Sequence, residues 1–282
     1  MARVYMADGN YVKAQALAEN ALTLAKAQTG SNSVEERSKC LIDLAFLYKN
    51  QGKFAEAQKV CEKGLELQKQ IYYKDHPYIA STLRILSSIY LGQEKYIEAQ
   101  EILAEAIEIM RKSHLPDDPA LASFQVDMAR ILAAQGKLDE AEAIYLPAIK
   151  IIDESYGNDH LYTAGVLGSL AELYTLQARY DEAEKIIDKT LKIQEEAYGR
   201  QSAHSQKWVA GISSWLTKAE ICQAKKDYDQ SENLLKTALD TAEKYLGASH
   251  PTTIRIQSRL AQLYTMREQE NNQEISTEVA KL

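Results

Sequence analysis

The stretch that decides the fold reads Leu44-Ala45-Phe46-Leu47-Tyr48 and, three residues later, Gly52-Lys53-Phe54-Ala55-Glu56-Ala57. Apolar residues on both sides of Gly52 lie three and four positions apart, which is the period of an α-helix. Glycine adopts the backbone angles of a sharp turn more readily than other residues. The stretch therefore predicts two consecutive helices joined by a short turn.

Variants of this stretch recur six times along the chain. The large apolar residue that follows the turn is Tyr11, Phe54, Tyr96, Leu138, Tyr180 and Tyr228. The intervals between these residues are 43, 42, 42, 42 and 48. A period of this length predicts a helical repeat protein, because no helix pair can bury its apolar face without stacking on its neighbours.

Small residues recur at one position in each expected helix. The first helices carry Ala45, Ser87, Ala129, Ala171, Ala219 and Ala261, and the second helices carry Ala14, Ala57, Ala99, Ala141, Ala183 and Ser231. Two helices approach to the usual distance of about 8 to 10 Å only where the side chains at their crossing are small. We therefore expect an all-α, superhelical α-solenoid of antiparallel helix pairs.

We expect the array to cover residues 1–266. A partial first repeat covers 1–30, complete repeats lie at about 34–74, 77–115, 119–156, 161–198 and 203–246, and a final helix covers 251–266. Residues 267–282 lack the turn motif and are mostly polar, so we expect a polar C-terminal cap or tail. Six added residues fall between Gly199 and Lys218 and would lengthen a helix by about 9 Å.

Charge and cysteine content narrow the classes of partner and compartment. The 282 residues include 33 basic and 40 acidic side chains, a net charge of -7. This balance argues against nucleic acid and membrane surfaces as partners, because both attract cationic proteins. Three cysteines without C-x-x-C spacing predict neither a disulfide framework nor a zinc site. With no signal peptide recognisable, we expect a cytoplasmic protein.

The sequence contains no motif that indicates catalysis. A glycine-rich phosphate loop, H-E-x-x-H and G-x-S-x-G are all missing, so we expect no enzyme activity, catalytic residue or cofactor. The histidines lie one per loop between repeats: His76, His114, His160, His204 and His250. Neighbouring loops would be roughly 20 Å apart, at about 10 Å per helix. This spacing favours loop capping over a metal site.

The motifs resemble the tetratricopeptide repeat, in the 42-residue variety of kinesin light chains. Pieces that match this variety are Gln51-Gly52-Lys53-Phe54, Gly157-Asn158-Asp159-His160 and Gly247-Ala248-Ser249-His250-Pro251. The resemblance implies a right-handed superhelix whose first helices line a concave groove that binds peptides or partner helices.

The first-helix positions that point away from the second helices are the candidate groove residues. They are Lys39, Ile42, Phe46, Lys49, Asn50, Arg84, Ser88, Leu91, Arg130, Glu172, Glu220 and Arg255. The set is basic with apolar residues through Arg130 and acidic at Glu172 and Glu220. It predicts an acidic partner segment with apolar anchors. The alternative is that these are ordinary solvated charges.

The two tryptophans of the chain lie near the added residues. Trp208, Ile212 and Trp215 are four and three positions apart and share one helical face. They either pack between repeats or form an aromatic ledge for a partner.

Two functions from different classes fit these observations. The first is a protein–protein interaction scaffold that forms part of a longer chain, since residues 2–5 align with the last turns of a first helix. The alternative is the regulatory or sensor repeat region of an enzyme, an NTPase or a peptidase, whose catalytic module lies outside this sequence.

Overall fold

The computed structural model describes residues 11–27, 31–199, 209 and 211–279, and all regular structure in these ranges is helical. The chain divides into two compact units, Met1–Val166 (unit 1) and Leu167–Leu282 (unit 2). The boundary lies inside one helix, α9 (Leu161–Leu176).

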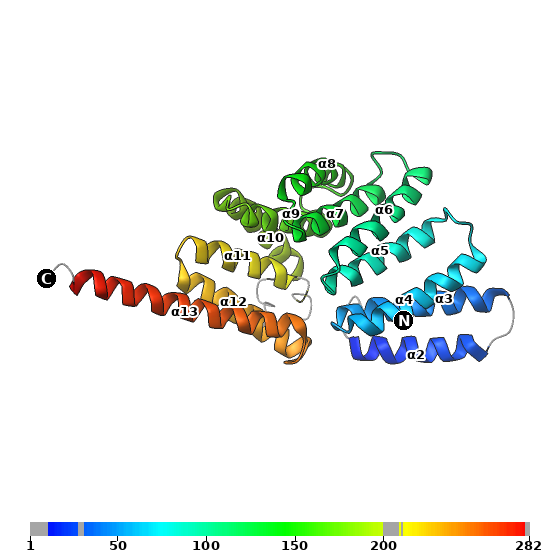
Figure 1. The fold of residues 1–282 in the computed structure, drawn as a ribbon, viewed down its shortest axis with the longest axis horizontal. Coiled ribbons are helices and arrows are strands. Elements are labelled where there is room, and N and C mark those ends of the chain that lie inside the picture. The colour runs from blue at the N-terminus through cyan, green and yellow to red at the C-terminus, as the bar shows by residue number, and fades with distance from the viewer. Residues whose placement is uncertain (1–10, 28–30, 200–208, 210, 280–282) are drawn as a thin grey trace. The chain divides into compact units, whose positions relative to one another are not determined.

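Unit 1 is a stack of helices in which each helix packs on the next along the chain (Figure 1). Its helices are α2 (Tyr11–Ala27), α3 (Ser31–Asn50), α4 (Phe54–Ile71), α5 (Pro77–Gly92), α6 (Tyr96–Ser113), α7 (Pro119–Ala134) and α8 (Leu138–Tyr156). The first helices of successive pairs also touch, α3 with α5 and α5 with α7. Unit 1 therefore presents one face made of α3, α5 and α7.

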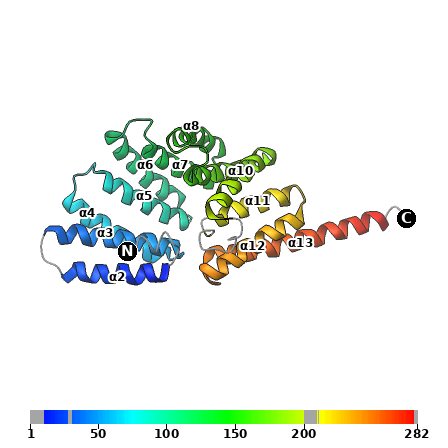
Figure 2. The same cartoon turned by 180° about the vertical axis from the view of Figure 1, so that it is seen from behind.

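Unit 2 continues the same alternation, as the view from behind also shows (Figure 2). Its further helices are α10 (Tyr180–Tyr198), α11 (Ile212–Ala224), α12 (Tyr228–Tyr245) and α13 (Pro251–Val279). Helix α11 packs on α10 and α12, and α13 packs on α12. The predicted fold class, an all-α solenoid of antiparallel helix pairs, is confirmed.

Small residues lie where the helices of a pair cross. Ala45, Ala57, Ala129 and Ala141 are all fully buried. Larger side chains fill the space beside the crossings, and one continuous core cluster runs from α3 to α7. The close approach of the helices thus depends on the recurring small residue, as the sequence predicts.

The turn between the two helices of a pair uses one left-handed residue each time. Positive φ angles occur at Gly52 (72°), Glu94 (61°), Gly136 (80°), Ala178 (57°) and Lys226 (65°). Only two of these five residues are glycine, so the other three adopt a conformation that L-residues disfavour. The turn is set by the packing of the two helices as much as by the turn residue.

Capping residues mark the starts of several first helices. Pro77 and Pro119 begin α5 and α7, where the missing N–H costs no hydrogen bond. The Asp118 carboxylate accepts a 2.7 Å bond from the Ala120 N–H, and His76 Nδ1 accepts a 3.1 Å bond from the Tyr78 N–H. The His76 ring is therefore a helix cap.

A polar side chain at one recurring position, at or just after the end of α3, α5, α7 and α11 and within α13, joins the helix to the preceding pair. In unit 1 the bonds are amide pairs: Gln51 Nε2 to Gln15 Oε1 (2.9 Å), Gln93 Nε2 to Gln58 Oε1 (3.0 Å) and Gln135 Nε2 to Gln100 Oε1 (2.8 Å). In unit 2 the equivalent bonds are ion pairs: Lys225 with Glu184 (2.5 Å) and Arg267 with Glu232 (3.3 Å). We call this series the inter-repeat stitch.

One expectation about helix length needs correction. Helix α13 does not end near residue 266 but continues to Val279, with Arg267 and Glu270 joined to α12 and its preceding turn by ion pairs to Glu232 and Lys226. The predicted tail from 267 is therefore helical through most of its length. Most of the stretch that holds the six added residues, 200–208 and 210, lies outside the described residues, so the expected lengthening of this helix stays a prediction.

Candidate functional site

Three of the predicted groove residues line a pocket on the first-helix face of unit 1. Lys39, Ile42 and Phe46 belong to a pocket of about 730 Å³ between α3, the end of α4 and α5. The other lining residues are Glu36, Cys40, Asp43, Gln68, Tyr72, Tyr78, Ser81, Thr82 and Ile85. The α3 members are three and four positions apart, so one face of this helix forms one wall. We call this the α3–α5 pocket.

Sequence reasoning did not identify the second wall of this pocket. Tyr72 and Tyr78 come from the connection before α5 and its first turn, and His76 lies between them. The His76 ring stacks on Tyr72 with ring centres 4.3 Å apart, and Tyr72 meets Tyr78 edge to face at 5.4 Å. The spacing of two aromatic residues around a capping histidine is the signal that could have indicated this wall.

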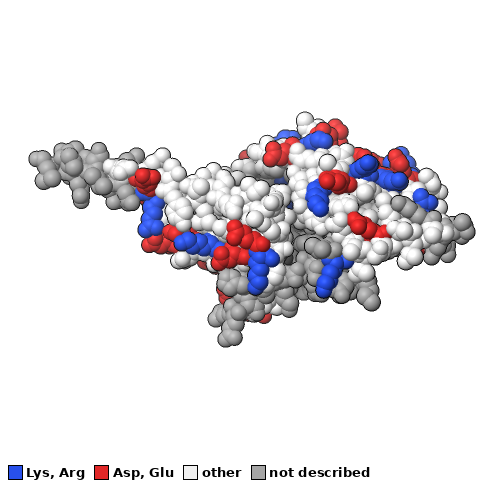
Figure 3. Space-filling model, turned by 90° about the horizontal axis from the view of Figure 1, so that it is seen from below, with Lys and Arg blue, Asp and Glu red and all other residues white. Residues whose placement is uncertain are grey.

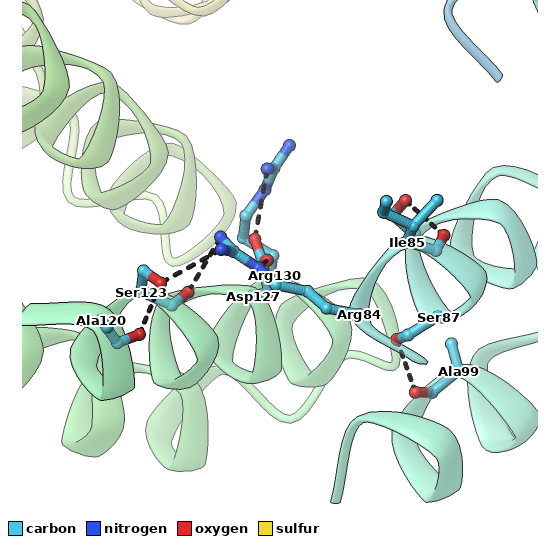
Figure 4. Close-up of polar contacts among 9 residues, drawn as sticks. Arg84, Ile85, Ser87, Ala99, Ala120, Ser123, Asp127 and Arg130 are labelled. Atoms are coloured by element: carbon cyan, nitrogen blue, oxygen red, sulfur yellow. Dashed lines mark hydrogen bonds and ion pairs between the residues drawn. The ribbon is translucent and has the colours of Figure 1, made fainter. Parts of the chain in front are cut away.

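A group of charged residues lies further along the same face. Arg84 of α5 and Arg130 of α7 both pair with Asp127 of α7 (Figure 4). Lys49 of α3 is close enough to these three residues for their charges to act on its pKa, and we call the four residues the cation cluster. The Arg84 guanidinium pairs with Asp127 and donates to Ser123 Oγ at 3.1 Å. Arg130 Nη1 lies 3.8 Å from Asp127 Oδ1. Three cations and one anion leave the cluster with two surplus positive charges.

Burial and the charges of the cluster both act on the Lys49 ammonium group. Burial lowers the pKa of its ammonium group, Asp127 opposes that effect, and Arg130 and Arg84 lower the pKa further. The Lys49 Nζ atom lies 4.8 Å from the centre of the Phe46 ring, which also lines the α3–α5 pocket. The cluster and the pocket are therefore adjacent parts of one surface. An anion beside Lys49 would stabilise its charged form.

Other predicted groove residues in unit 1 serve the fold. The Ser88 hydroxyl donates to the Ile85 carbonyl of its own helix at 2.7 Å, and Leu91 packs against the core. Asn50 is half-buried at the end of α3. Sequence spacing places these residues on the first helices, but their side chains are engaged within the unit.

The predicted acidic stretch in unit 2 is a mixed group. Glu172 is exposed, but Glu220 pairs with Arg259 at 3.0 Å. Arg255 and Arg259 line a hollow of about 560 Å³ on α13, and burial followed by the Arg259 charge lowers the pKa of Arg255. Two cations thus balance the two carboxylates. The expectation of acidic charge in this half is wrong because Arg259, one turn after Arg255 on α13, pairs with Glu220.

Surface charge elsewhere is also mixed. On the face drawn in Figure 3, basic and acidic side chains of the described residues lie beside one another in small groups. The cation cluster is therefore distinguished by its composition and not by a wide basic field.

The aromatic-ledge alternative is wrong for Trp215. Its side chain is 6% exposed and belongs to the core cluster of unit 2 with Leu216 and Leu235. Trp208 lies outside the described residues. Trp215 therefore packs between helices, which is the other expectation stated for it.

Histidine and cysteine residues are placed for structural roles. His160 and His250, like His76, accept a backbone N–H through Nδ1, at 3.2 and 3.1 Å. Burial raises the pKa of Cys61 to about 12 and that of Cys222 to about 11, so both stay protonated at neutral pH. Among the residues that the structure describes, no group of three or more metal-ligating side chains could hold an ion. His204 lies outside these residues.

An array of antiparallel helix pairs with small residues at each crossing defines an α-helical repeat protein. The tetratricopeptide repeat family matches residues 36–112, 120–202 and 212–272. The chain belongs to this family, and it shares its fold with repeats of a putative kinesin light chain. It is a repeat scaffold of the kind that serves protein interaction. None of the described helices is long and apolar enough to cross a membrane.

Solved structures with the same fold include BtubC (BKLC) from P. vanneervenii, which is 19% identical. The match covers 86% of this chain and 94% of that chain, with a TM-score of 0.60. A second solved structure is a putative kinesin light chain of Podosopora anserina with nearly identical TPR-like repeats, and its sequence identity to this chain is 22%. That match covers 74% of this chain and 95% of that chain, with a TM-score of 0.53.

A Rap protein complexed with Competence and Sporulation Factor is 14% identical. That match covers 94% of this chain and 73% of that chain, with a TM-score of 0.63. No curated protein matches the chain.

Proposed function

We propose that this chain is an interaction scaffold whose first-helix face in unit 1 binds an acidic segment of a partner protein that also carries apolar anchors. The observation that carries the proposal is the cation cluster. Lys49, Arg84 and Arg130 come from three successive first helices and face a single carboxylate, in a chain of net charge -7. Such a local surplus complements an acidic ligand.

The three cations of the cluster have different roles in the proposed binding. Arg84 already bonds Asp127 and Ser123, so it links α5 to α7 and positions the cluster. Lys49 and Arg130 supply the charge that remains for a ligand. A partner carboxylate beside them gains charge-assisted hydrogen bonds and removes the repulsion among the cations.

Neighbouring structures support a binding role for the fold. The Rap protein was solved in a complex with Competence and Sporulation Factor, so a related helical array holds a factor. The matched proteins are repeat proteins, and such repeats are typically non-catalytic scaffolds. These matches favour the scaffold over the regulatory region of an NTPase or peptidase. The described cysteines are free thiols, consistent with the cytoplasmic location that we propose.

A display selection tests the proposed function. Dodecamer peptides selected on the immobilised protein should be rich in Asp and Glu. Replacing Lys49 and Arg130 by glutamine should raise the Kd of such peptides about tenfold. The Kd should also depend less on salt concentration, because the two attractions that salt screens, from Lys49 and from Arg130 to the peptide, are lost. The matched control K59Q/K63Q removes two exposed lysines of the second helix α4. Equal losses in both double variants, or selected peptides without acidic residues, would refute the proposal.

A further inference from the structure

The α3–α5 pocket has the opposite charge from the cation cluster beside it. The charged side chains that line the pocket are Glu36, Lys39 and Asp43, all from α3, which is two carboxylates against one ammonium. Lys39 Nζ lies 2.7 Å from Oε1 of Glu35, outside the lining, and 4.0 Å from Glu36 Oε1, so its positive charge is engaged mainly by Glu35. The pocket is therefore a negative site on a face whose other half is positive.

The negative charge of the pocket affects the pKa of the Cys40 thiol on its wall. Burial raises the pKa of Cys40, and the Asp43 and Glu36 carboxylates raise it further. Both carboxylates line the pocket together with Cys40.

Aromatic and aliphatic side chains make up most of the remaining lining. Phe46, Tyr72 and Tyr78 present rings, and Ile42 and Ile85 present aliphatic groups. The Tyr72 ring is held by its stack on His76. Rings beside carboxylates suit a cation with an apolar stem, through cation–π contact and ion pairing.

We propose that the α3–α5 pocket binds one long basic side chain, an arginine or a lysine, of the partner segment. This inference rests on the proposed function, in which acidic residues of the same segment lie at the cation cluster. The aliphatic stem would cover Ile42 and Ile85, and the charged end would reach Glu36 and Asp43. An acidic side chain would be repelled there. A purely apolar side chain would remove the carboxylates from water and add no attraction between opposite charges.

Cys40 allows the charge preference of the pocket to be measured without a partner. The full chain is treated at low salt with aminoethyl methanethiosulfonate, a cation, and with sulfonatoethyl methanethiosulfonate, an anion. With each reagent the Cys40 thiolate attacks the sulfenyl sulfur, a disulfide forms and methanesulfinate leaves, while the thiol proton goes to water. Mass spectrometry of the Cys40 peptide gives the two rates separately from Cys61 and Cys222, which are 0% and 2% exposed.

The ratio of the cationic to the anionic rate should exceed that of N-acetylcysteine amide, a neutral free thiol, about tenfold. In E36Q/D43N the ratio should fall towards that of the free thiol. The control E101Q/E105Q removes two exposed carboxylates of α6 and should leave the ratio unchanged. A wild-type ratio at or below the free-thiol value would overturn the proposal. This experiment uses no peptide, so its failure is distinguishable from failure of the proposed function.

A second arm tests the occupant itself. In a peptide selected on the protein, replacing its Arg or Lys by Gln should weaken binding to the wild type about tenfold and to E36Q/D43N by much less. Equal losses in both proteins would show that the basic residue binds elsewhere and would overturn the assignment of the occupant.

Discussion

Individual turn residues carry strain that the repeat imposes on them. Ala178 has φ of 57° at the turn before α10, where Gly52 and Gly136 occupy the same position in other repeats. A β-carbon in the left-handed region costs roughly 1 to 2 kcal/mol. The repeat tolerates this cost because the flanking helices determine the turn.

Replacing Ala178 by glycine should therefore stabilise the protein by up to about 1 kcal/mol. Glycine relieves the strain in the folded state, and its greater entropy in the unfolded chain offsets part of this gain. Urea denaturation followed by circular dichroism measures the change. The reciprocal variant G136A, at φ of 80°, should destabilise the protein. Destabilisation in both variants would show that the Ala178 methyl group contributes contacts that outweigh the strain.

Glu184 links the stability of unit 2 to pH. Hydrogen bonds from Lys218 and then Lys225 hold its pKa below the usual range of a glutamate. A carboxyl with a lowered folded pKa stabilises the folded state above its unfolded pKa, and this stabilisation is lost as pH falls through the folded value.

Wild type should thus lose stability as pH falls below about 4.3, the ordinary glutamate value, and E184Q should lose less over the same range. Melting temperatures between pH 6 and pH 3 measure the difference. The matched variant E195Q changes another glutamate of α10. If E184Q and wild type lost stability in parallel, Glu184 would not be the linked group.

Helix crossings depend on small side chains in the middle of α7 and α8. Ala129 is fully buried where α7 packs on α8, whereas Ala134 at the end of α7 is exposed. Arginine at position 129 would have to bury its charge or separate the helices, so A129R should cost several kcal/mol. Thermal unfolding of A129R and of the control A134R tests this. Equal melting temperatures would contradict the assignment of the crossing.

Helix α13 gives a second test at the scale of an element. A variant that ends at Met266 removes the part of α13 that Arg267 and Glu270 join to Glu232 and Lys226. It should lose the circular dichroism signal of about three helical turns and melt at a lower temperature. An unchanged spectrum per molecule would instead support the polar tail that the sequence suggests.

The inter-repeat stitch shows what periodicity can reveal and what it cannot. Gln51, Gln93 and Gln135 recur every 42 residues, so their position was visible in the sequence. Their partners Gln15, Gln58 and Gln100 recur at intervals of 43 and 42, but the sequence does not show that the two series meet, because a glutamine is common on any polar helix surface. In unit 2 the ion pair Lys225–Glu184 takes the place of an amide pair, and this replacement can be recognised only in the structure, where the two side chains meet.

At the scale of the whole molecule, the fold was predictable and the chemistry of its binding face was only partly so. Small crossing residues at a regular interval are enough to predict stacked helix pairs. The cation cluster depends on Asp127, which lies 43 residues from Arg84 and meets it only through the packing of α5 on α7. The α3–α5 pocket likewise needs Tyr72 and Tyr78 from a connection whose path the period does not define.

The most direct measurement for the central claim is photo-crosslinking of a selected acidic peptide that carries benzoylphenylalanine beside its acidic residues. After irradiation, mass spectrometry identifies the attached residues. We predict attachment to α3, α5 and α7 around Lys49 and Arg130, and loss of attachment in K49Q/R130Q. Attachment to the second helices α4, α6 and α8, or to unit 2, would contradict the claim that the first-helix face of unit 1 is the binding site.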